Sequence, residues 1–128
     1  MKKALHTDLA PAAIGPYSQA IKTDKTIYVS GQLPVDPATG NFPSDDIKEQ
    51  TKQSLTNIKN ILASEGYEMT DVVKTTVLLA DINDFAAMNE VYATFFDGEA
   101  GFPARSAFQV VAVPRGAKLE IEAIAYKD

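Results

Sequence analysis

The chain has 128 residues, the size of one domain, and 45% of them are hydrophobic, which is enough to build a packed core. Its 17 acidic and 12 basic residues give a net charge of −5, and the scattered basic residues argue against nucleic acid as a partner. The lack of cysteine excludes disulfides, thiolate zinc sites and a cysteine nucleophile, and the single histidine argues against histidine triads, haem and multi-histidine metal sites.

The sequence is expected to fold as a single domain over residues 1–128 in the cytoplasm. No apolar stretch approaches the roughly 20 residues that a membrane span needs. The first residues carry charge without an apolar segment behind them, so we expect no signal peptide. A cysteine-free chain suits a reducing compartment.

The first elements in chain order are a turn and a strand. Gly15-Pro16-Tyr17-Ser18-Gln19 predicts a turn that leads into a strand. Residues 26–32 are β-branched and aromatic and predict a second strand, which ends near Gly31. Residues 33–43 contain three prolines and predict a loop.

A helix is expected over residues 45–65, with Ser44 as its N-cap and Gly66 as its stop. Its apolar residues fall largely on one face, as in a helix that packs on a core. These are Ile47, Leu55, Ile58, Ile61 and Leu62.

The second half of the chain predicts a strand over residues 71–79, a helix over 83–96 and strands over 105–113 and 118–126. The first of these strands is almost continuously β-prone, which is typical of an inner strand. The aromatic stripe of the second helix is interpreted as core packing. The pattern alone favours a hairpin between the last two strands.

Two helices would cover one face of the sheet, and the opposite face also carries many apolar residues. We therefore expect that face to pack in an oligomer.

Four features could carry chemistry, and each has a structural alternative. Tyr17 follows a turn and could simply cover the core edge. Gly31 allows a ligand to approach closely, or it marks a bulge. Arg105 stands at a strand start after Pro103 and suits capture of a carboxylate, or it forms a surface salt bridge. Glu120 and Glu122 share one face of an apolar strand. A carboxylate in such a place needs partners or has a raised pKa, and it can shuttle protons. The alternative is that the pair faces solvent or a partner subunit. Ser30 has no neighbouring histidine and is not interpreted as a nucleophile.

Together these segments resemble the RidA/YjgF family. The resemblance covers nearly the whole chain, in order and at matching spacing. It is carried by IGPYSQA (14–20), YVSGQLP (28–34), QTKQSLTNI (50–58), NEVY (89–92), PARS (103–106) and LEIEAIA (119–125).

The resemblance implies an α+β, chorismate-mutase-like fold: a mixed six-stranded sheet with two helices on one face, assembled as a homotrimer. It places the last strand next to the Ser30 strand and the Arg105 strand at the far side. Three strand spacings, roughly 14 Å, would then separate Arg105 from Ser30 within one chain, so the site is expected between subunits.

The implied activity is hydrolytic deamination of 2-iminobutanoate and 2-iminopropanoate to 2-keto acids and ammonia, as a hydrolase acting on C–N bonds. Arg105 would hold the substrate carboxylate, and Glu120 would position or activate the attacking water. Tyr17, Ser30, the Gly31 backbone and the backbone N–H of Ala107 would complete the site. Many relatives carry cysteine where this chain has Ala107. No metal or cofactor is expected, because a protonated imine carbon is already electrophilic.

Two other functions suggested by relatives remain open. One is a keto-acid-binding regulatory trimer without turnover, and the other is an endoribonuclease or translation inhibitor. The acidic balance speaks against the second.

Overall fold

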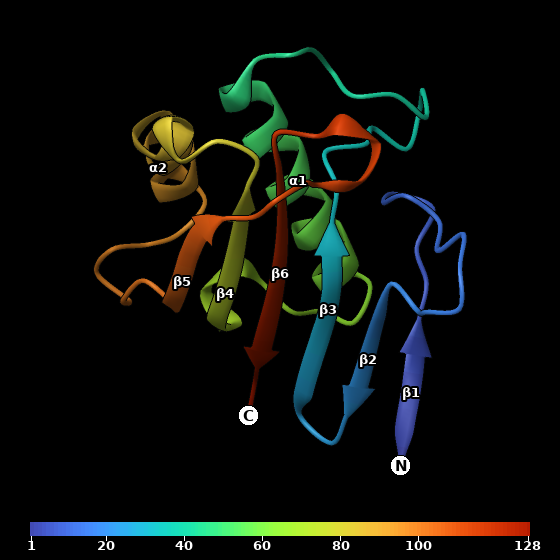
Figure 1. The fold of residues 1–128 in the computed structure, drawn as a ribbon. Coiled ribbons are helices and arrows are strands. Elements are labelled where there is room, and N and C mark those ends of the chain that lie inside the picture. The colour runs from blue at the N-terminus through green and yellow to red at the C-terminus, as the bar shows by residue number, and fades with distance from the viewer.

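A computed structural model describes residues 1–128 and shows a mixed six-stranded sheet with the order β1-β2-β3-β6-β4-β5 (Figure 1). Strands β4 and β5 run parallel, and the other neighbouring pairs are antiparallel. The sheet and its strand order match the fold implied by the resemblance. The bounds are β1 Lys2–Leu5, β2 Ala20–Thr23, β3 Thr26–Gln32, β4 Val72–Leu79, β5 Ala104–Gln109 and β6 Leu119–Tyr126.

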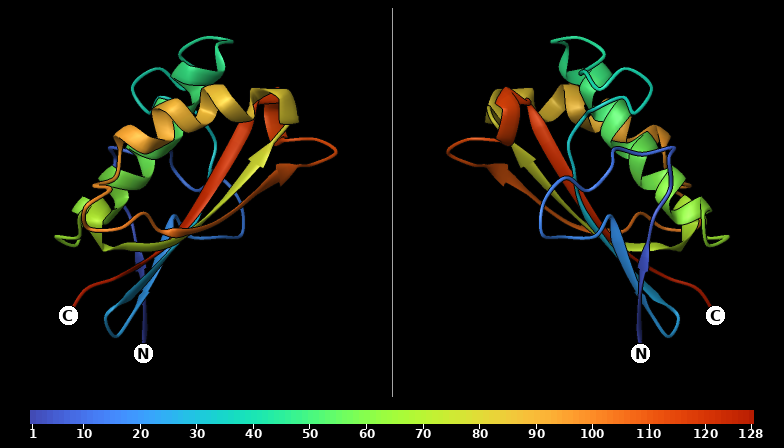
Figure 2. Two further views of the ribbon diagram at one scale, coloured as in Figure 1. Left: turned by 90° about the vertical axis from the view of Figure 1, so that its left-hand side faces the viewer. Right: turned by 90° about the vertical axis from the view of Figure 1, so that its right-hand side faces the viewer.

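Two helices, α1 (Ile47–Ala63) and α2 (Phe85–Thr94), cover one face of this sheet (Figure 2). All five apolar residues expected to face the core from α1 are buried. Met88 and Tyr92 of α2 are buried as well, and Phe85, Phe95 and Phe96 pack against the core. The interpretation of the aromatic stripe as core packing is therefore confirmed.

The beginning of α1 differs from the prediction. The N-cap is Asp46, whose carboxylate accepts a hydrogen bond from the Glu49 amide, and not Ser44. Ser44 lies two residues earlier, where its hydroxyl accepts from the Asp46 amide. The prediction erred because Ser and Asp are both good caps and stand close together.

The hairpin favoured by the last two predicted strands is wrong. Strand β4 lies between β5 and β6 and pairs with both. β5 also ends at Gln109 rather than at residue 113. β4 ends at Leu79 opposite Gln109, so the β-prone residues that follow have no strand to pair with.

The strands separate an inner face from an outer face. In β6, Leu119, Ile121, Ala123 and Ala125 are buried beneath the helices. The alternate residues, Glu120 and Glu122 among them, face outward as predicted. No helix or strand of this chain covers the outer face (Figure 2). It exposes about half of the side chains of Tyr28, Phe108 and Tyr126.

No helix is both long and apolar enough to span a bilayer.

Candidate functional site

A cleft of about 1000 Å³ opens at one end of the sheet. Its walls come from the loop between β1 and β2, the end of β3, the start of β6 and the turn around Arg115. Four of the predicted site residues line it: Tyr17, Ser30, Gly31 and Glu120. The structure thus brings together residues that lie up to 103 positions apart in the chain.

Glu120 lies directly against the backbone of β3 at Gly31. A Cβ atom added to Gly31 would stand only 2.7 Å from the Glu120 Cδ atom. Glycine is therefore needed here so that the carboxyl group can lie in the cleft. Burial raises the pKa of Glu120 above its usual value, and the nearby charge of Glu122 raises this pKa further.

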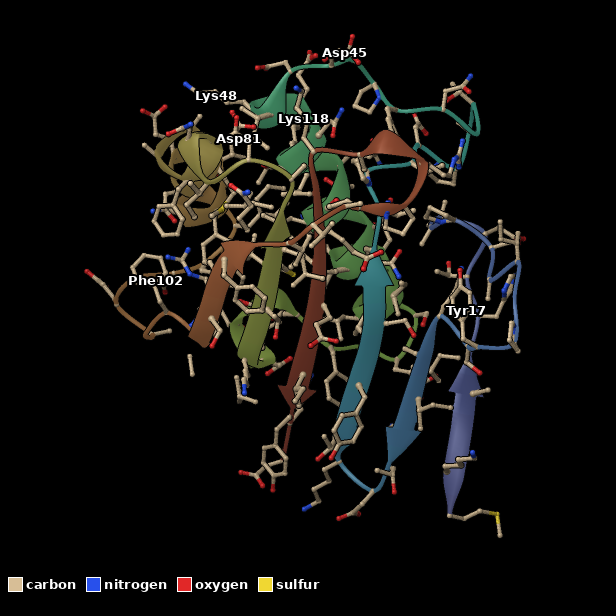
Figure 3. All side chains as sticks on the ribbon, in the orientation of Figure 1. Tyr17, Asp45, Lys48, Asp81, Phe102 and Lys118 are labelled. Atoms are coloured by element: carbon tan, nitrogen blue, oxygen red, sulfur yellow. The ribbon has the colours of Figure 1, made fainter.

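Tyr17 stands on the lip of the cleft, on the loop beyond β1 and β2 (Figure 3). Its amide donates to the Gly15 carbonyl at 2.8 Å, which closes a tight turn around Pro16. The side chain is 53% exposed and faces the cleft, so it does not act merely as a cover for the core edge.

The Ser30 hydroxyl already has a partner inside the chain. It donates to the Ser18 carbonyl at 2.6 Å, next to Tyr17 in the sequence. The Ser30 amide donates to the Gln19 carbonyl at 3.0 Å. Ser30 thus joins the end of β3 to the loop that carries Tyr17.

Arg105 lies outside this cleft, at the edge strand β5. Its guanidinium donates to the Asn89 side-chain oxygen at 2.6 Å and stacks over the Tyr92 and Phe85 rings at 4.8 and 5.3 Å. Tyr92 is fixed in turn by a 2.6 Å hydrogen bond between its hydroxyl and Thr75. No acidic residue pairs with Arg105, so the alternative of a surface salt bridge does not apply.

The register of the sheet separates Arg105 from Glu120 within one chain. Thr75 of β4 pairs with Arg105, whereas Leu78 of β4 pairs with Glu120. Arg105 and Glu120 are thus displaced by three residues along the strands and by two strand spacings across the sheet. Each of these displacements amounts to roughly 10 Å. The two side chains also lie on opposite faces, because Thr75 is buried on the inner face and Glu120 faces outward. In Figure 3, Phe102, just before β5, and Tyr17 lie at opposite edges of the sheet.

Ala107 lies on β5 near Arg105, and its side chain packs against the core. The Val110 amide donates to Leu79 of β4. Backbone N–H groups alternate in direction along a strand, and Ala107 is three positions from Val110. The N–H of Ala107 therefore points away from β4, toward the free edge of the sheet.

Several cleft residues were missed by sequence reasoning. His6 and Asp8 form a 2.9 Å pair at the rim, and Arg115, at φ 61°, donates to the Gly40 carbonyl at 3.2 Å. The His6 position had no pattern to mark it, while the Pro114-Arg115-Gly116 turn was a signal that went unused. No group of three or more histidine, aspartate or glutamate side chains forms a metal-binding cluster.

Comparison with known proteins finds close relatives over nearly the full length. A family model described as Endoribonuclease L-PSP matches residues 7–127. The chain is 55% identical over 125 residues to the 2-iminobutanoate/2-iminopropanoate deaminase of Capra hircus, a match that covers 98% of this chain and 90% of that protein.

Solved structures agree with the fold. The E. coli TdcF structure with bound serine has a TM-score of 0.93 and 46% identity, and the match covers 98% of this chain and 99% of that one. The E. coli YjgF gene product has a TM-score of 0.92 and 46% identity, with the same coverage.

Proposed function

This chain belongs to the RidA/YjgF family, whose model is described as Endoribonuclease L-PSP, and on that basis we propose that it hydrolyses 2-iminobutanoate and 2-iminopropanoate to the 2-keto acids and ammonia. The observation that carries the proposal is the Glu120 carboxyl group in the cleft against Gly31, with its raised pKa. A relative at 55% identity is named for this reaction.

The active site lies between subunits of a homotrimer, with Arg105 from one protomer facing the cleft of the next. Within one chain Arg105 and Glu120 lie on opposite faces of the sheet, so no small acid contacts both. The uncovered apolar side chains of the outer face supply a surface for such an assembly. A trimer repeats the same composite site at each of its interfaces.

Arg105 binds the substrate carboxylate. A guanidinium has five N–H donors in a rigid fork, and Asn89 accepts from Nη1. The Tyr92 and Phe85 rings restrict the plane of the fork, which leaves its remaining donors prepared for bidentate contact with a carboxylate. The Ala107 N–H at the same sheet edge adds a donor for this anion.

Glu120 moves the proton. Water adds to the iminium carbon, and the π electrons of the C=N bond move to nitrogen. Glu120 takes a proton from this water and returns it to the amino group. The C–N bond then breaks as the hydroxyl oxygen forms the C=O bond and gives its proton back to the Glu120 carboxylate, which releases the keto acid and ammonia. A pKa raised above the usual glutamate range suits a group that both accepts and donates a proton.

The test couples threonine dehydratase to the purified protein and follows 2-iminobutanoate decay. We expect faster decay with wild-type protein and a loss of that effect in Arg105→Ala. Arg105→Lys restores little, since a single ammonium does not reproduce the bidentate fork. Wild-type decay in Arg105→Ala would refute the assignment.

Two outcomes would favour the alternative functions. Saturable binding of 2-oxobutanoate without faster imine decay would indicate a ligand-binding regulator, in keeping with the serine-bound structure of E. coli TdcF. Cleavage of purified RNA that is abolished in Glu120→Ala would indicate the activity in the family description.

We place the imine hydrolysis in the cytoplasm, which cell fractionation tests.

A further inference from the structure

A single buried side chain, that of Gln19, fastens the start of the loop that forms one cleft wall. Only 2% of Gln19 is exposed. Its Oε1 accepts from the Thr7 amide at 2.8 Å, and its Nε2 donates to the carbonyls of Thr7, Ala10 and Pro11 at 3.0, 3.3 and 2.8 Å. Both ends of one amide group are thus used to hold residues 7–11.

The end of the same loop is fastened by Ser30, through the hydroxyl bond to the Ser18 carbonyl and the amide bond to the Gln19 carbonyl. Gln19 and Ser30 are therefore neighbours in one network that reaches both ends of the loop. Outside this network, the start of the loop is held by Asn60 of α1, which donates to the Leu9 carbonyl at 3.0 Å, and by Ala10, which is buried in the core.

Between these attachments the loop has no regular secondary structure. Ile14 and Tyr17 are largely exposed there. Such a segment has little packing of its own to fix it, so its position depends on the few hydrogen bonds at its ends.

We propose that Gln19 and Ser30 are positioning residues that hold Tyr17 at the cleft and act on the reaction only through it. The proposal rests on the proposed imine hydrolysis for its kinetic readout. Gln19 is buried beneath the loop and Ser30 is already bonded to Ser18, so Tyr17 is the side chain of this network that is free to meet the substrate.

The kinetic test is a double-mutant cycle between Gln19→Leu and Tyr17→Ala in the coupled imine assay. Misplacement of a binding group by about 1 Å lowers rates up to roughly 100-fold, so Gln19→Leu should lower kcat/KM by about 10- to 100-fold. In the Tyr17→Ala background the same change should have less than about a twofold effect, because its target is gone. Equal effects in both backgrounds would overturn the proposal.

Ser30 supplies a second variant in case Gln19→Leu does not fold. Ser30→Ala removes the bond to Ser18 and should show the same coupling to Tyr17, whereas Ser30→Thr retains a hydroxyl and should restore activity. Failure of Ser30→Thr to restore any activity lost in Ser30→Ala would contradict a positioning role.

A readout independent of turnover separates this inference from the proposed function. The Thr7 amide loses its acceptor in Gln19→Leu, so its hydrogen exchange should accelerate by at least about tenfold. Unchanged exchange would show that Gln19 does not hold residues 7–11, and it would overturn the proposal even if the enzyme is active. An inactive wild-type protein would instead refute the proposed function and leave the exchange result valid.

Tyr67→Phe is the matched control. It removes a buried side chain's 2.7 Å hydrogen bond to a backbone carbonyl, that of Lys25, away from the cleft. It should show neither a change in kcat/KM nor coupling to Tyr17. An effect equal to that of Ser30→Ala would contradict the proposal, because it would show that the loss of any such hydrogen bond lowers activity.

Discussion

At the scale of single residues, the close approach of Glu120 to Gly31 governs where the Glu120 carboxyl group lies. The carboxyl group occupies the space that any side chain at residue 31 would need. The sequence indicated that Gly31 permits a close approach, and it placed Glu120 on an outward face. The residue patterns alone did not pair the two, because that pairing depends on β6 lying beside β3, a placement that came only with the resemblance.

Gly31→Ala should therefore reduce activity nearly as much as the loss of Glu120 itself, with only a small change in stability. The added methyl group clashes with the end of a flexible side chain, which moves out of place while the backbone remains. Imine turnover and thermal unfolding measure the two effects. Gly98→Ala is the control, since its Cβ atom would meet Phe102 no closer than 3.4 Å.

The pH dependence should follow the raised pKa of Glu120. This group accepts a proton only when ionised, so kcat/KM should fall on acidification with an inflection above the usual glutamate range. Glu122→Gln removes a negative charge that raises this pKa, so the inflection should move to lower pH. An inflection that stays in place in Glu122→Gln would contradict the coupling between the two carboxylates.

At the scale of elements, the helices and inner strands were predictable because their apolar residues repeat with the period of the element. The edge strand β1 was not, because it has only four residues and begins with two lysines instead of an apolar pattern. Strand β2 was expected only as a strand after the turn at residues 15–19, without bounds. The end of β5 was also missed, because it is set by the length of β4 rather than by local propensity.

The N-cap of α1 makes a prediction at this scale. Asp46→Ala should lower the free energy of unfolding by about 1 kcal/mol, because the Glu49 amide loses its acceptor. Asp45→Ala is the control: this exposed neighbour, labelled in Figure 3, makes no hydrogen bond and should change stability by less than about 0.5 kcal/mol. Urea unfolding of both variants measures the difference, and equal losses would contradict the assignment of the cap.

At the scale of the whole molecule, the proposed site residues divide into two groups. Tyr17, Ser30, Gly31 and Glu120 gather in one cleft, while Arg105 and Ala107 lie at the far edge strand. Local sequence patterns suggested each residue type separately, but the distance between the groups came only with the strand order implied by the resemblance. The pattern alone favoured a hairpin that would have placed Arg105 beside the Glu120 strand.

The most direct test of a shared site combines two variants that are each inactive, Arg105→Ala and Glu120→Gln. If Arg105 and Glu120 act from adjoining protomers, a trimer assembled at random from equal amounts of both variants regains about one quarter of its sites intact. We therefore predict imine hydrolysis at about one quarter of the wild-type rate in co-expressed, mixed trimers. Mixed assemblies, verified by native mass spectrometry, that remain as inactive as either parent would contradict the account.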